Sequence, residues 1–531
     1  MAISMRLFII YFLSINYACL AASTGDSICN LTPYPAFCES NSPSTGKGDI
    51  HAYGRYFAGK SLSSSKMFVS LVSKYLKKSQ FPKSTMLALE DCNLLGDLNK
   101  GFWQRAQKRI NNTDTLSSSE AQNLHTLLSA TLTNYDTCLN SIQETTSSPD
   151  DELLSHLSNG TKFYSISLAF FKRGWVANDA KTETNGEVWE EKVYEVVRRR
   201  GRKLLQLGAD NANVVVVNPD GSGNFTSIND AVGAAPNNTG GSNVNGFFVI
   251  HVVAGVYEEY VSIPKNKQYL MMVGDGINQT IITGNRSVVD GWTTFNSATF
   301  AVVAQGFVAI NITFRNTAGA AKHQAVAVRS GADLSAFYNC SFEGYQDTLY
   351  THSLRQFYRN CDIYGTVDFI FGNAAVVLQE CNIQARVPLE NQFNAITAQG
   401  RTDINQNTGT VIHNCSIGAA SDLATSNGTT KKTYLGRPWK QYSRTVYMQS
   451  FMDSLIDPSG WAAWSGDFAL DTLYYAEFDN NGPGSNTTDR VTWPGYHLIN
   501  ASDAVNFTVD NFILGSAWLP ATGVPFLPDL L

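Results

Sequence analysis

A short pattern that recurs five times between residues 311 and 417 limits most strongly what this chain can fold into. Each copy places a polar, a small, a polar and an apolar residue in order, and successive copies start about 20 to 30 residues apart, the period of a stacked solenoid coil. With one strand per copy and parallel strands about 4.8 Å apart, the pattern predicts an all-β parallel β-helix. The copies are Asn311–Phe314, Asn339–Phe342, Asn360–Ile363, Glu380–Ile383 and Asn414–Ile417.

The chain divides into two halves of different texture. With 531 residues it is too long for one ordinary core, so we expect two domains. Up to about Asn178 it reads as an all-α helical bundle, because apolar residues of Leu116–Ile142 recur at three- and four-residue spacing. From about Asn213 it changes to short β-branched and aromatic runs, which begin at Val214–Val217.

The first residues have the pattern of a signal peptide, assigned to residues 1–22. Arg6 precedes an apolar run from Leu7 to Ile15, and the small residues Ala21 and Ala22 follow it. The run is too short to span a bilayer, and no later segment is apolar for about 20 residues. The sequence therefore predicts a secreted, extracellular protein without stable membrane association.

The cysteines indicate two separately crosslinked units. Without Cys19, which the signal peptidase would remove, four cysteines lie in each half. No pair has CxxC spacing, so no metal site is predicted. Cys340 and Cys361 occupy equivalent points of consecutive coils, and the sequence predicts that they form a disulfide if the geometry allows. Sequons typical of a glycoprotein occur at Asn30, Asn111, Asn159, Asn237 and Asn427.

Residues 179–205 form a linker that contains a basic run, Arg198–Leu205. The run is either a solvated linker or a site for a processing protease at Arg202 and Lys203, and its place between the two cysteine groups favours processing. Basic residues outnumber acidic ones up to residue 205, and acidic ones dominate from residue 206. Opposite charges would help a leader domain dock on the part that it precedes.

Asp368 stands between a valine and a Phe-Ile-Phe run, where an unpaired carboxylate would be costly. It lies seven residues after Cys361, as Asp347 lies seven residues after Cys340. The two acids should therefore be stacked neighbours in consecutive coils. Two carboxyl groups this close resist ionising together, so one should keep its proton while the other stays charged. The alternative is a ladder of polar side chains with a purely structural role, which explains one acid better than two.

Nearby residues fit a reactive pair. Gln346 adjoins Asp347 and Gln324 lies one coil earlier, where neutral amides could donate hydrogen bonds to a developing oxyanion. Arg437 could hold a carboxylate ionised by a bidentate bond, and Trp439 offers a flat face for a sugar ring. Taken alone, each glutamine is as typical of a surface position or of a row of side chains that hydrogen-bond along the stack. Taken alone, Arg437 to Trp439 is typical of a turn with a core aromatic residue.

Together these residues resemble the plant pectin methylesterases, over about residues 210–515. The resemblance rests on several stretches of this sequence: Asp220–Thr226, Gly255–Glu259, Gly344–Tyr350, Gly365–Asn373, Leu435–Trp439, Trp461–Asp467 and Gly482–Gly484. The first half resembles the inhibitor-like leader domain of the same family, most clearly at Leu127–Cys138. The leader is the more divergent part.

The resemblance implies an inhibitor-like helical pro-domain at 23–178 and a right-handed β-helix catalytic domain at 206–531. It implies disulfides Cys29–Cys38 and Cys92–Cys138 in the leader. The expected reaction is hydrolysis of galacturonate methyl esters in cell-wall pectin, without metal or organic cofactor. The expected partners are pectin, the leader itself, a processing protease and separate inhibitor proteins; a monomer that binds no nucleic acid is expected.

The resemblance also assigns roles to single residues. Asp368 would be the nucleophile, and Asp347 the proton donor and later the base. Gln346 and Gln324 would stabilise the oxyanion, and Arg437 would keep Asp368 charged. The implied substrate contacts are Thr294, Gln324, Arg437 and Trp439.

Two other function classes remain open from the sequence. A glycoside hydrolase or polysaccharide lyase could use the same fold, because fold does not fix function. The two glutamines suit a carbonyl oxyanion and would be idle in acetal cleavage, and no acidic cluster suited to a lyase's calcium stands out. A non-catalytic wall-binding or inhibitory protein is the third reading. It would be favoured by substitution of Asp347, Asp368 or Arg437, and all three are present.

Overall fold

The computed structural model describes residues 27–43, 48–78, 81–146, 151–176, 214–239, 246–426 and 431–531. The predicted signal peptide (1–22) and the processing residues Arg202 and Lys203 lie outside the described residues. The predicted domain boundaries at residues 178 and 205 fall in the undescribed stretch 177–213, so they stay predictions.

The first half is a helical bundle, as predicted. Its helices begin where capping residues satisfy free backbone amides: Asp49 accepts from the Ala52 amide at 2.8 Å, and Ser117 accepts from the Glu120 amide at 3.4 Å. The disulfides Cys29–Cys38 and Cys92–Cys138 are both present, which confirms the pairing that the resemblance implied. The helices are α1 (Pro35–Ser40), α2 (Ile50–Leu76), α3 (Lys83–Ile110), α4 (Ser118–Thr145) and α5 (Asp151–Gly174).

The second half is a parallel β-helix of three sheets, and every strand pair of the described sheets is parallel. The seven-stranded sheet contains β4 (Val261–Ile263), β7 (Phe300–Val302), β10 (Val328–Ser330), β13 (Leu349–Thr351), β16 (Ile370–Gly372), β19 (Asn394–Gln399) and β22 (Thr433–Gly436). The eight-stranded sheet contains β3 (Gly255–Tyr257), β6 (Thr280–Gly284), β9 (Thr313–Asn316), β12 (Ser341–Glu343), β15 (Asp362–Gly365), β18 (Asn382–Ala385), β21 (Ser416–Ala419) and β24 (Phe451–Met452).

The third sheet has eleven strands, and in each coil from β4 to β24 its strand follows that of the seven-stranded sheet and precedes that of the eight-stranded sheet. It contains β1 (Val214–Val217), β2 (Phe248–Val252), β5 (Leu270–Gly274), β8 (Val308–Ile310), β11 (Ser335–Tyr338), β14 (Arg355–Arg359), β17 (Ala375–Gln379), β20 (Gly409–His413), β23 (Arg444–Met448), β25 (Tyr474–Phe478) and β26 (Tyr496–Leu498). Short helices complete the half: α7 (Ile228–Ala234), α8 (Ser421–Thr425), α9 (Ala501–Ala504), α10 (Val509–Ile513) and α11 (Leu519–Thr522).

The five repeated quartets lie in register, but they are not whole strands. The first residue of each has a left-handed backbone, as at Asn339 with φ 51° and Asn360 with φ 50°, and makes the bend between two sheets. The strand starts only at the third residue, so that Ser341 pairs with Asp362. Asparagine adopts the left-handed region more readily than other side chains, and the polar first position therefore marks a bend.

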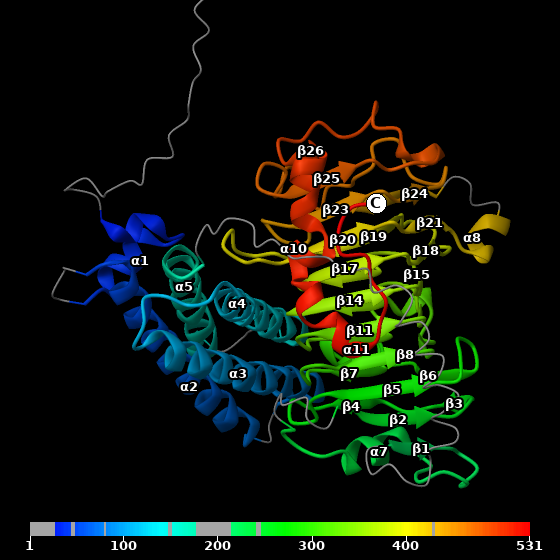
Figure 1. The fold of residues 1–531 in the computed structure, drawn as a ribbon, viewed down its shortest axis with the longest axis horizontal. Helices are drawn as coiled ribbons and strands as arrows, with labels where there is room; N and C mark the ends of the chain where they lie inside the picture. The colour runs from blue at the N-terminus through cyan, green and yellow to red at the C-terminus, as the bar shows by residue number, and fades with distance from the viewer. Residues whose placement is uncertain are drawn as a thin grey trace, which may run out of the picture.

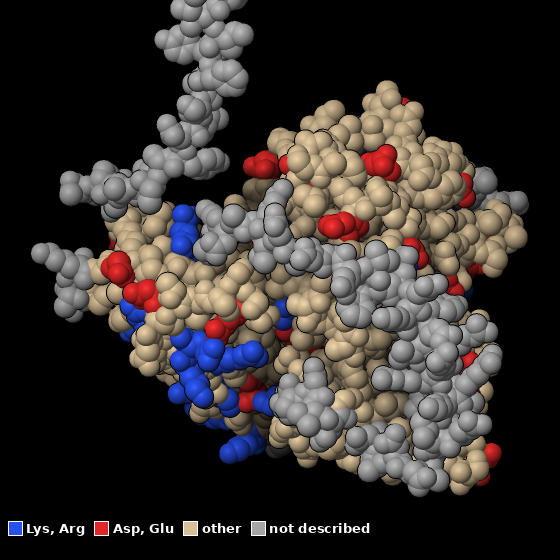
Figure 2. Space-filling model, viewed as in Figure 1, with Lys and Arg blue, Asp and Glu red and all other residues tan. Residues whose placement is uncertain are grey.

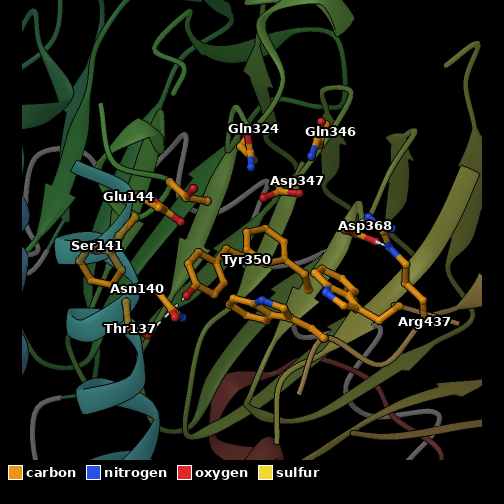
Figure 3. A pocket seen from close by; sticks show the side chains of 16 residues that line it. Thr137, Asn140, Ser141, Glu144, Gln324, Gln346, Asp347, Tyr350, Asp368 and Arg437 are labelled. Carbon is orange, nitrogen blue, oxygen red and sulfur yellow. Dashed lines mark hydrogen bonds and ion pairs between the residues drawn. The ribbon is translucent and has the colours of Figure 1, made fainter. Parts of the chain in front are cut away.

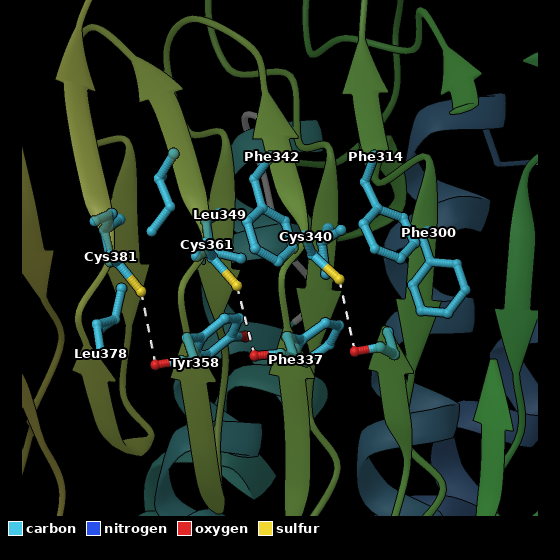
Figure 4. Packing of buried hydrophobic residues seen from close by; sticks show 14 of the residues in the cluster. Phe300, Phe314, Phe337, Cys340, Phe342, Leu349, Tyr358, Cys361, Leu378 and Cys381 are labelled. Atoms are coloured by element: carbon cyan, nitrogen blue, oxygen red, sulfur yellow. Dashed lines mark hydrogen bonds between the residues drawn. The ribbon is translucent and has the colours of Figure 1, made fainter. Parts of the chain in front are cut away.

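Aromatic side chains fill the interior of the β-helix between successive coils (Figure 4). Phe314 stacks on Phe342 with ring centroids 5.7 Å apart, and Phe337 stacks on Tyr358 at 4.8 Å. The apolar row is continuous because strands of consecutive coils put equivalent side chains above one another. This close-packed stack holds neighbouring coils in a fixed register.

The predicted disulfide between Cys340 and Cys361 is wrong. Both are buried free thiols, as are Cys381 and Cys415. The Cys361 Sγ lies 3.5 Å from the carbonyl oxygen of Phe337 in the previous coil instead (Figure 4). In parallel strands that lie in register, the Cβ atoms of equivalent residues point in the same direction and lie about 4.8 Å apart. This distance is longer than the usual separation of the two Cβ atoms in a disulfide.

The leader lies against the β-helix on the side of the seven-stranded sheet, and lysine and arginine gather on its visible face (Figures 1 and 2). Local ion pairs between the halves have the opposite polarity to the net charges. Within the described residues the leader gives the acid in both of them: Asp97 pairs with Lys265, and Asp136 pairs with Lys440. Among the described helices, none combines the length and apolar character needed to cross a bilayer.

We expect the four β-helix cysteines to react with iodoacetamide when the unreduced full chain is unfolded, since their thiols are free. Peptide mass spectrometry should find all four alkylated and should find the two leader disulfides intact. The leader pairs serve as the internal control for oxidation. A crosslinked peptide joining Cys340 to Cys361 would contradict the structure.

Candidate active site

One row of outward side chains on the seven-stranded sheet forms the floor of a cleft. Arg329, Tyr350 and Phe371 occupy paired positions on β10, β13 and β16. Ala398 continues the row on β19. The residue that precedes each of them on its strand points inward into the core, as Leu349 and Ile370 do. Alternation along each strand therefore separates an interior face from a face that can bind a ligand.

Asp347 and Asp368 stand side by side above this floor. The pairing of Leu349 with Ile370 puts the two acids at equivalent positions, two residues before each strand. The amide of Asp347 donates to the carbonyl of Val367 at 3.1 Å, which ties the two turns together. Both acids have left-handed backbones, with φ of 62° and 53°. Such a conformation costs free energy for a residue with a side chain, and here it turns both carboxyl groups toward the cleft.

Arg437 reaches Asp368 from a coil 69 residues later in the chain. Its Nε and Nη2 donate to the two carboxylate oxygens at 2.8 and 2.7 Å, a bidentate ion pair. The guanidinium lies over the ring of Trp464, 4.4 Å from its centroid. The pair fixes the carboxylate of Asp368 in one orientation and favours its ionised form.

The surroundings give the two carboxyl groups different pKa values. Burial raises the pKa of Asp347 well above its usual range, and the charge of Asp368 raises it further. Burial also raises the pKa of Asp368, but the hydrogen bonds and charge of Arg437 oppose that rise. Asp347 therefore keeps its proton to higher pH, and Asp368 is the one that ionises.

Gln324 and Gln346 line the same cavity, of about 310 Å³, and both point toward Asp347 (Figure 3). The Oε1 atom of Gln346 has no hydrogen-bond partner among the described residues. Two amides beside a buried carboxyl pair can donate hydrogen bonds to an oxyanion without adding charge.

Aromatic side chains and Thr294 complete the walls of the cavity. Tyr350 stacks on Phe371 with centroids 4.1 Å apart, and Trp439 meets Phe371 edge to face at 5.9 Å. The indole of Trp439 lies against Gly400, where an added Cβ would come within 2.8 Å of the ring. The structure thus brings all the predicted catalytic and substrate-contact residues to one cleft, from loops and strands of five coils.

Helix α4 of the leader lies across this cleft and presents one polar residue per turn to it. Thr137 Oγ1 hydrogen bonds with His352 Nε2 at 2.9 Å, and Thr133 accepts from Asn373 at 2.8 Å. Further contacts along the same face are His125 with Asn405, Ser129 with Gln406, and Asn140 with Lys440. The leader therefore closes the cleft along its length.

Glu144, at the end of this face, enters the cavity itself (Figure 3). Glu144 keeps access to solvent, yet partial loss of water raises its pKa, and hydrogen bonds from the amide and hydroxyl of Thr294 oppose that rise. The charge of Glu144 in turn raises the pKa of Asp347. A leader carboxylate thus stands next to the reactive acids.

A second leader carboxylate, Asp91 of α3, is buried against the enzyme half, next to residues that line the cavity. Thr293 Oγ1 donates to it at 2.6 Å, and Asn296 Nδ2 donates to its other oxygen. Burial raises the pKa of Asp91 to about 7, against the effects of Thr293 and Arg329.

The sequence reasoning missed Asp91, Glu144 and Arg329. A signal existed for Asp91, because it interrupts the apolar side of its helix next to Cys92, between Ala88 and Leu95. Glu144 carried no such signal, since a glutamate near a helix end is ordinary. Arg329 could have been noticed as a charge inside an apolar strand.

No metal site is formed by the cleft acids within the described part of the chain. The one group of three potential ligands found there is Asp49, His51 and Asp114, in the leader.

Two family models match the chain in sequence. The model described as "Pectinesterase" matches residues 214–516, and the one described as "Plant invertase/pectin methylesterase inhibitor" matches residues 23–170. The matches correspond to the β-helix and the helical bundle.

Named relatives agree with these matches. The chain is 55% identical over 539 residues to "Probable pectinesterase/pectinesterase inhibitor 20" of Arabidopsis thaliana, covering 96% of this chain and 94% of the relative. It is 53% identical over 552 residues to "Probable pectinesterase/pectinesterase inhibitor 41" of the same plant, covering 96% of each. Among solved structures, "Pectin methylesterase from Carrot" is 56% identical with a TM-score of 0.58, covering 60% of this chain and 98% of that one.

Gly400→Ala should destabilise the β-helix by about 1 to 3 kcal/mol, because the added methyl group would overlap the indole of Trp439. Urea unfolding of the β-helix measures the change. Gly233→Ala on α7 is the control, since an added Cβ meets nothing within 4 Å there. Equal stability of the Gly400→Ala protein and the wild type would contradict the close packing of Trp439.

Proposed function

Since the chain belongs to the pectinesterase family and carries an inhibitor-like domain before the esterase domain, we propose that Asp368 and Asp347 are its nucleophile and acid. The protein is a carboxylic ester hydrolase that cleaves the methyl esters of galacturonate units in pectin, releases methanol and leaves free carboxylates. The observation that carries the assignment is the in-register acid pair, one member of which is ion-paired to Arg437.

In the first half of the reaction, the charged carboxylate of Asp368 attacks the ester carbonyl carbon. The carbonyl oxygen gains negative charge, and the amides of Gln324 and Gln346 donate hydrogen bonds to it. Asp347 gives its proton to the departing methoxide, so methanol leaves as a neutral molecule. The product of this step is an anhydride between Asp368 and the galacturonate.

In the second half, Asp347 has become a carboxylate and takes a proton from a water molecule. The hydroxide attacks the galacturonyl carbonyl carbon and displaces the carboxylate of Asp368, which Arg437 again stabilises. Asp347 is then protonated, and both acids are back in their starting states. Thr294 and Trp439, which also line the cavity, contact the sugar.

The leader holds the enzyme in a closed precursor. Helix α4 covers the cleft and Glu144 lines the cavity that is left, so a polysaccharide cannot enter while the leader is docked. The chain enters the secretory pathway, and a basic-specific protease cleaves it at Arg202 or Lys203. The released enzyme acts in the cell wall as a monomer. Separate inhibitor proteins with the leader's fold would bind the same cleft.

Asp368→Asn should lower the rate of methanol release from methylated pectin about 1,000-fold or more, as expected for loss of a nucleophile. Methanol release by residues 214–531, produced without the leader, measures the effect, and circular dichroism checks folding. Asp362→Asn, on the outside of the same coil, is the matched control. Turnover within about tenfold of the wild type would rule out Asp368 as the nucleophile.

The leader should hold the cleft more tightly in acid than at neutral pH. Asp91 titrates at about 7 when docked, whereas a free aspartate titrates near 3.8, so the docked state binds the extra proton. Glu144 acts in the same direction, because burial raises its pKa in the docked state and its charge raises the pKa of Asp347. Raising the pH from about 4 to 7 therefore weakens docking.

The activity of the full chain relative to the leader-free chain measures this effect and should increase over that pH range. Asp91→Asn in the full chain should flatten the increase, because the amide keeps an acceptor but cannot titrate. Glu152→Gln, on α5 outside the cleft, should leave the increase as it is. A ratio that stays constant or falls with pH would contradict the account.

A further inference from the structure

Helix α2 of the leader has a row of lysines on its outer side. The helix and the two residues that follow it contain six lysine and arginine residues and no aspartate or glutamate. Five of the six are exposed, and with 3.6 residues per turn they fall within about a third of the circumference of the helix. They are Lys60, Lys66, Lys74, Lys77 and Lys78, here called the cationic face. Figure 2 shows lysine and arginine gathered over α2 and α3.

The lysines of the cationic face have no ion-pair partner among the described residues. Other cations of the leader are paired: Arg55 with Asp114 at 2.6 Å, and Arg109 with Glu120. At about 1.5 Å per residue, the face extends about 26 Å along the helix from its first lysine to Lys77. A row of like charges of this length, with no acid to cancel it, attracts a long anionic molecule.

The cationic face stays accessible while the leader closes the cleft. On its other side, α2 buries Phe57, Phe68 and Val72 within the bundle. The contacts that cover the cleft come from α4, and those of Asp91 beside it come from α3 (Figure 1). A ligand of the cationic face can therefore bind the closed precursor without entering the active site.

The chemistry of the chain indicates a polysaccharide with free carboxylates as this ligand. The proposed reaction leaves such carboxylates on pectin, which is a linear polymer. The enzyme half does not attract this product by its net charge, because acidic residues outnumber basic ones from residue 206 onward. Lysine suits a polymer of carboxylates, since a point charge on a flexible stem requires no fixed partner geometry.

A lipid surface is another anionic partner of basic helices, and α2 does not fit it. A helix that lies in a membrane interface inserts an apolar face between the lipids. The apolar side of α2 is packed in the core of the bundle. Of the large apolar residues of this helix, Met67 alone is exposed, at 55%. The face thus offers charge for a polymer and almost no apolar surface for a bilayer.

We propose that the cationic face of α2 binds de-esterified pectin and thereby holds the closed precursor on the polymer. The proposal rests on the proposed function, whose product is this ligand. Hydrolysis by released enzyme would create further binding sites for the precursor nearby. Cleavage of the linker would then free an acidic enzyme half from the place where the leader is held. The leader is thus an anchor as well as a cover for the cleft.

Binding of the full chain to polygalacturonate, measured by biolayer interferometry, tests the anchor. The polymer is de-esterified with alkali, so the measurement does not depend on the activity of the chain. Lys66→Gln together with Lys74→Gln should raise the Kd about fivefold or more, since each lysine near an anionic surface adds to binding. The matched control, Arg109→Gln together with Lys162→Gln, removes the same charge from the leader outside the face. It should leave the Kd within about twofold.

Further measurements separate recognition of charge from loss of structure. Fully methylated pectin should not bind to the wild-type chain, and raising the salt from about 0.05 M to about 0.5 M should weaken its binding to polygalacturonate. Both variant pairs should leave methanol release by the full chain unchanged, as expected if the leader stays folded and docked.

Equal Kd values for the two variant pairs would overturn the anchor. A lower Kd for vesicles of equal parts phosphatidylserine and phosphatidylcholine than for polygalacturonate would overturn it too, in favour of a lipid surface. Methanol release from methylated pectin by the leader-free chain tests the proposed function separately.

Discussion

In-register stacking of parallel coils is the constraint on which the rest of this structure depends. Equivalent residues of consecutive coils lie about 4.8 Å apart, so the side chain in one coil limits the size and polarity of the equivalent side chain in the next coil. Inside the helix, this stacking gives continuous rows of phenylalanine and of free cysteine. On the outside of the seven-stranded sheet, it gives a cleft floor and brings two aspartates together that are 21 residues apart in sequence.

The chemistry follows from how unequally the surroundings treat these two acids. Both are buried and both have left-handed backbones, so neither sequence position nor conformation separates them. Arg437 separates them, because it binds both oxygens of Asp368 and none of Asp347 in the hydrogen bonds found. One carboxyl group is thus prepared to attack, and the other to donate a proton. The leader uses carboxylates on the same cleft, with Glu144 next to Thr294 and Asp91 next to Thr293.

Much of this arrangement could be predicted from local regularities. The spacing of the quartets predicts the β-helix, and the equal offsets of Asp347 and Asp368 from their cysteines predict the pair. Predictions failed where the outcome depended on the direction of a side chain or of the backbone and not on the distance between residues. Cys340 and Cys361 are adjacent but point the same way, and the quartets begin with a bend because asparagine accepts a positive φ. Contacts between the halves could not be predicted, because Asp97 and Asp136 oppose the sign of the net charges.

Neutron diffraction from leader-free crystals near pH 6 tests the central claim most directly, because it locates the proton on each carboxyl group. We expect a deuteron on Asp347 and none on Asp368, whose two oxygens should accept only from Arg437. A deuteron on Asp368 with Asp347 bare, or two ionised carboxylates side by side, would contradict the separation of roles by burial and ion pairing.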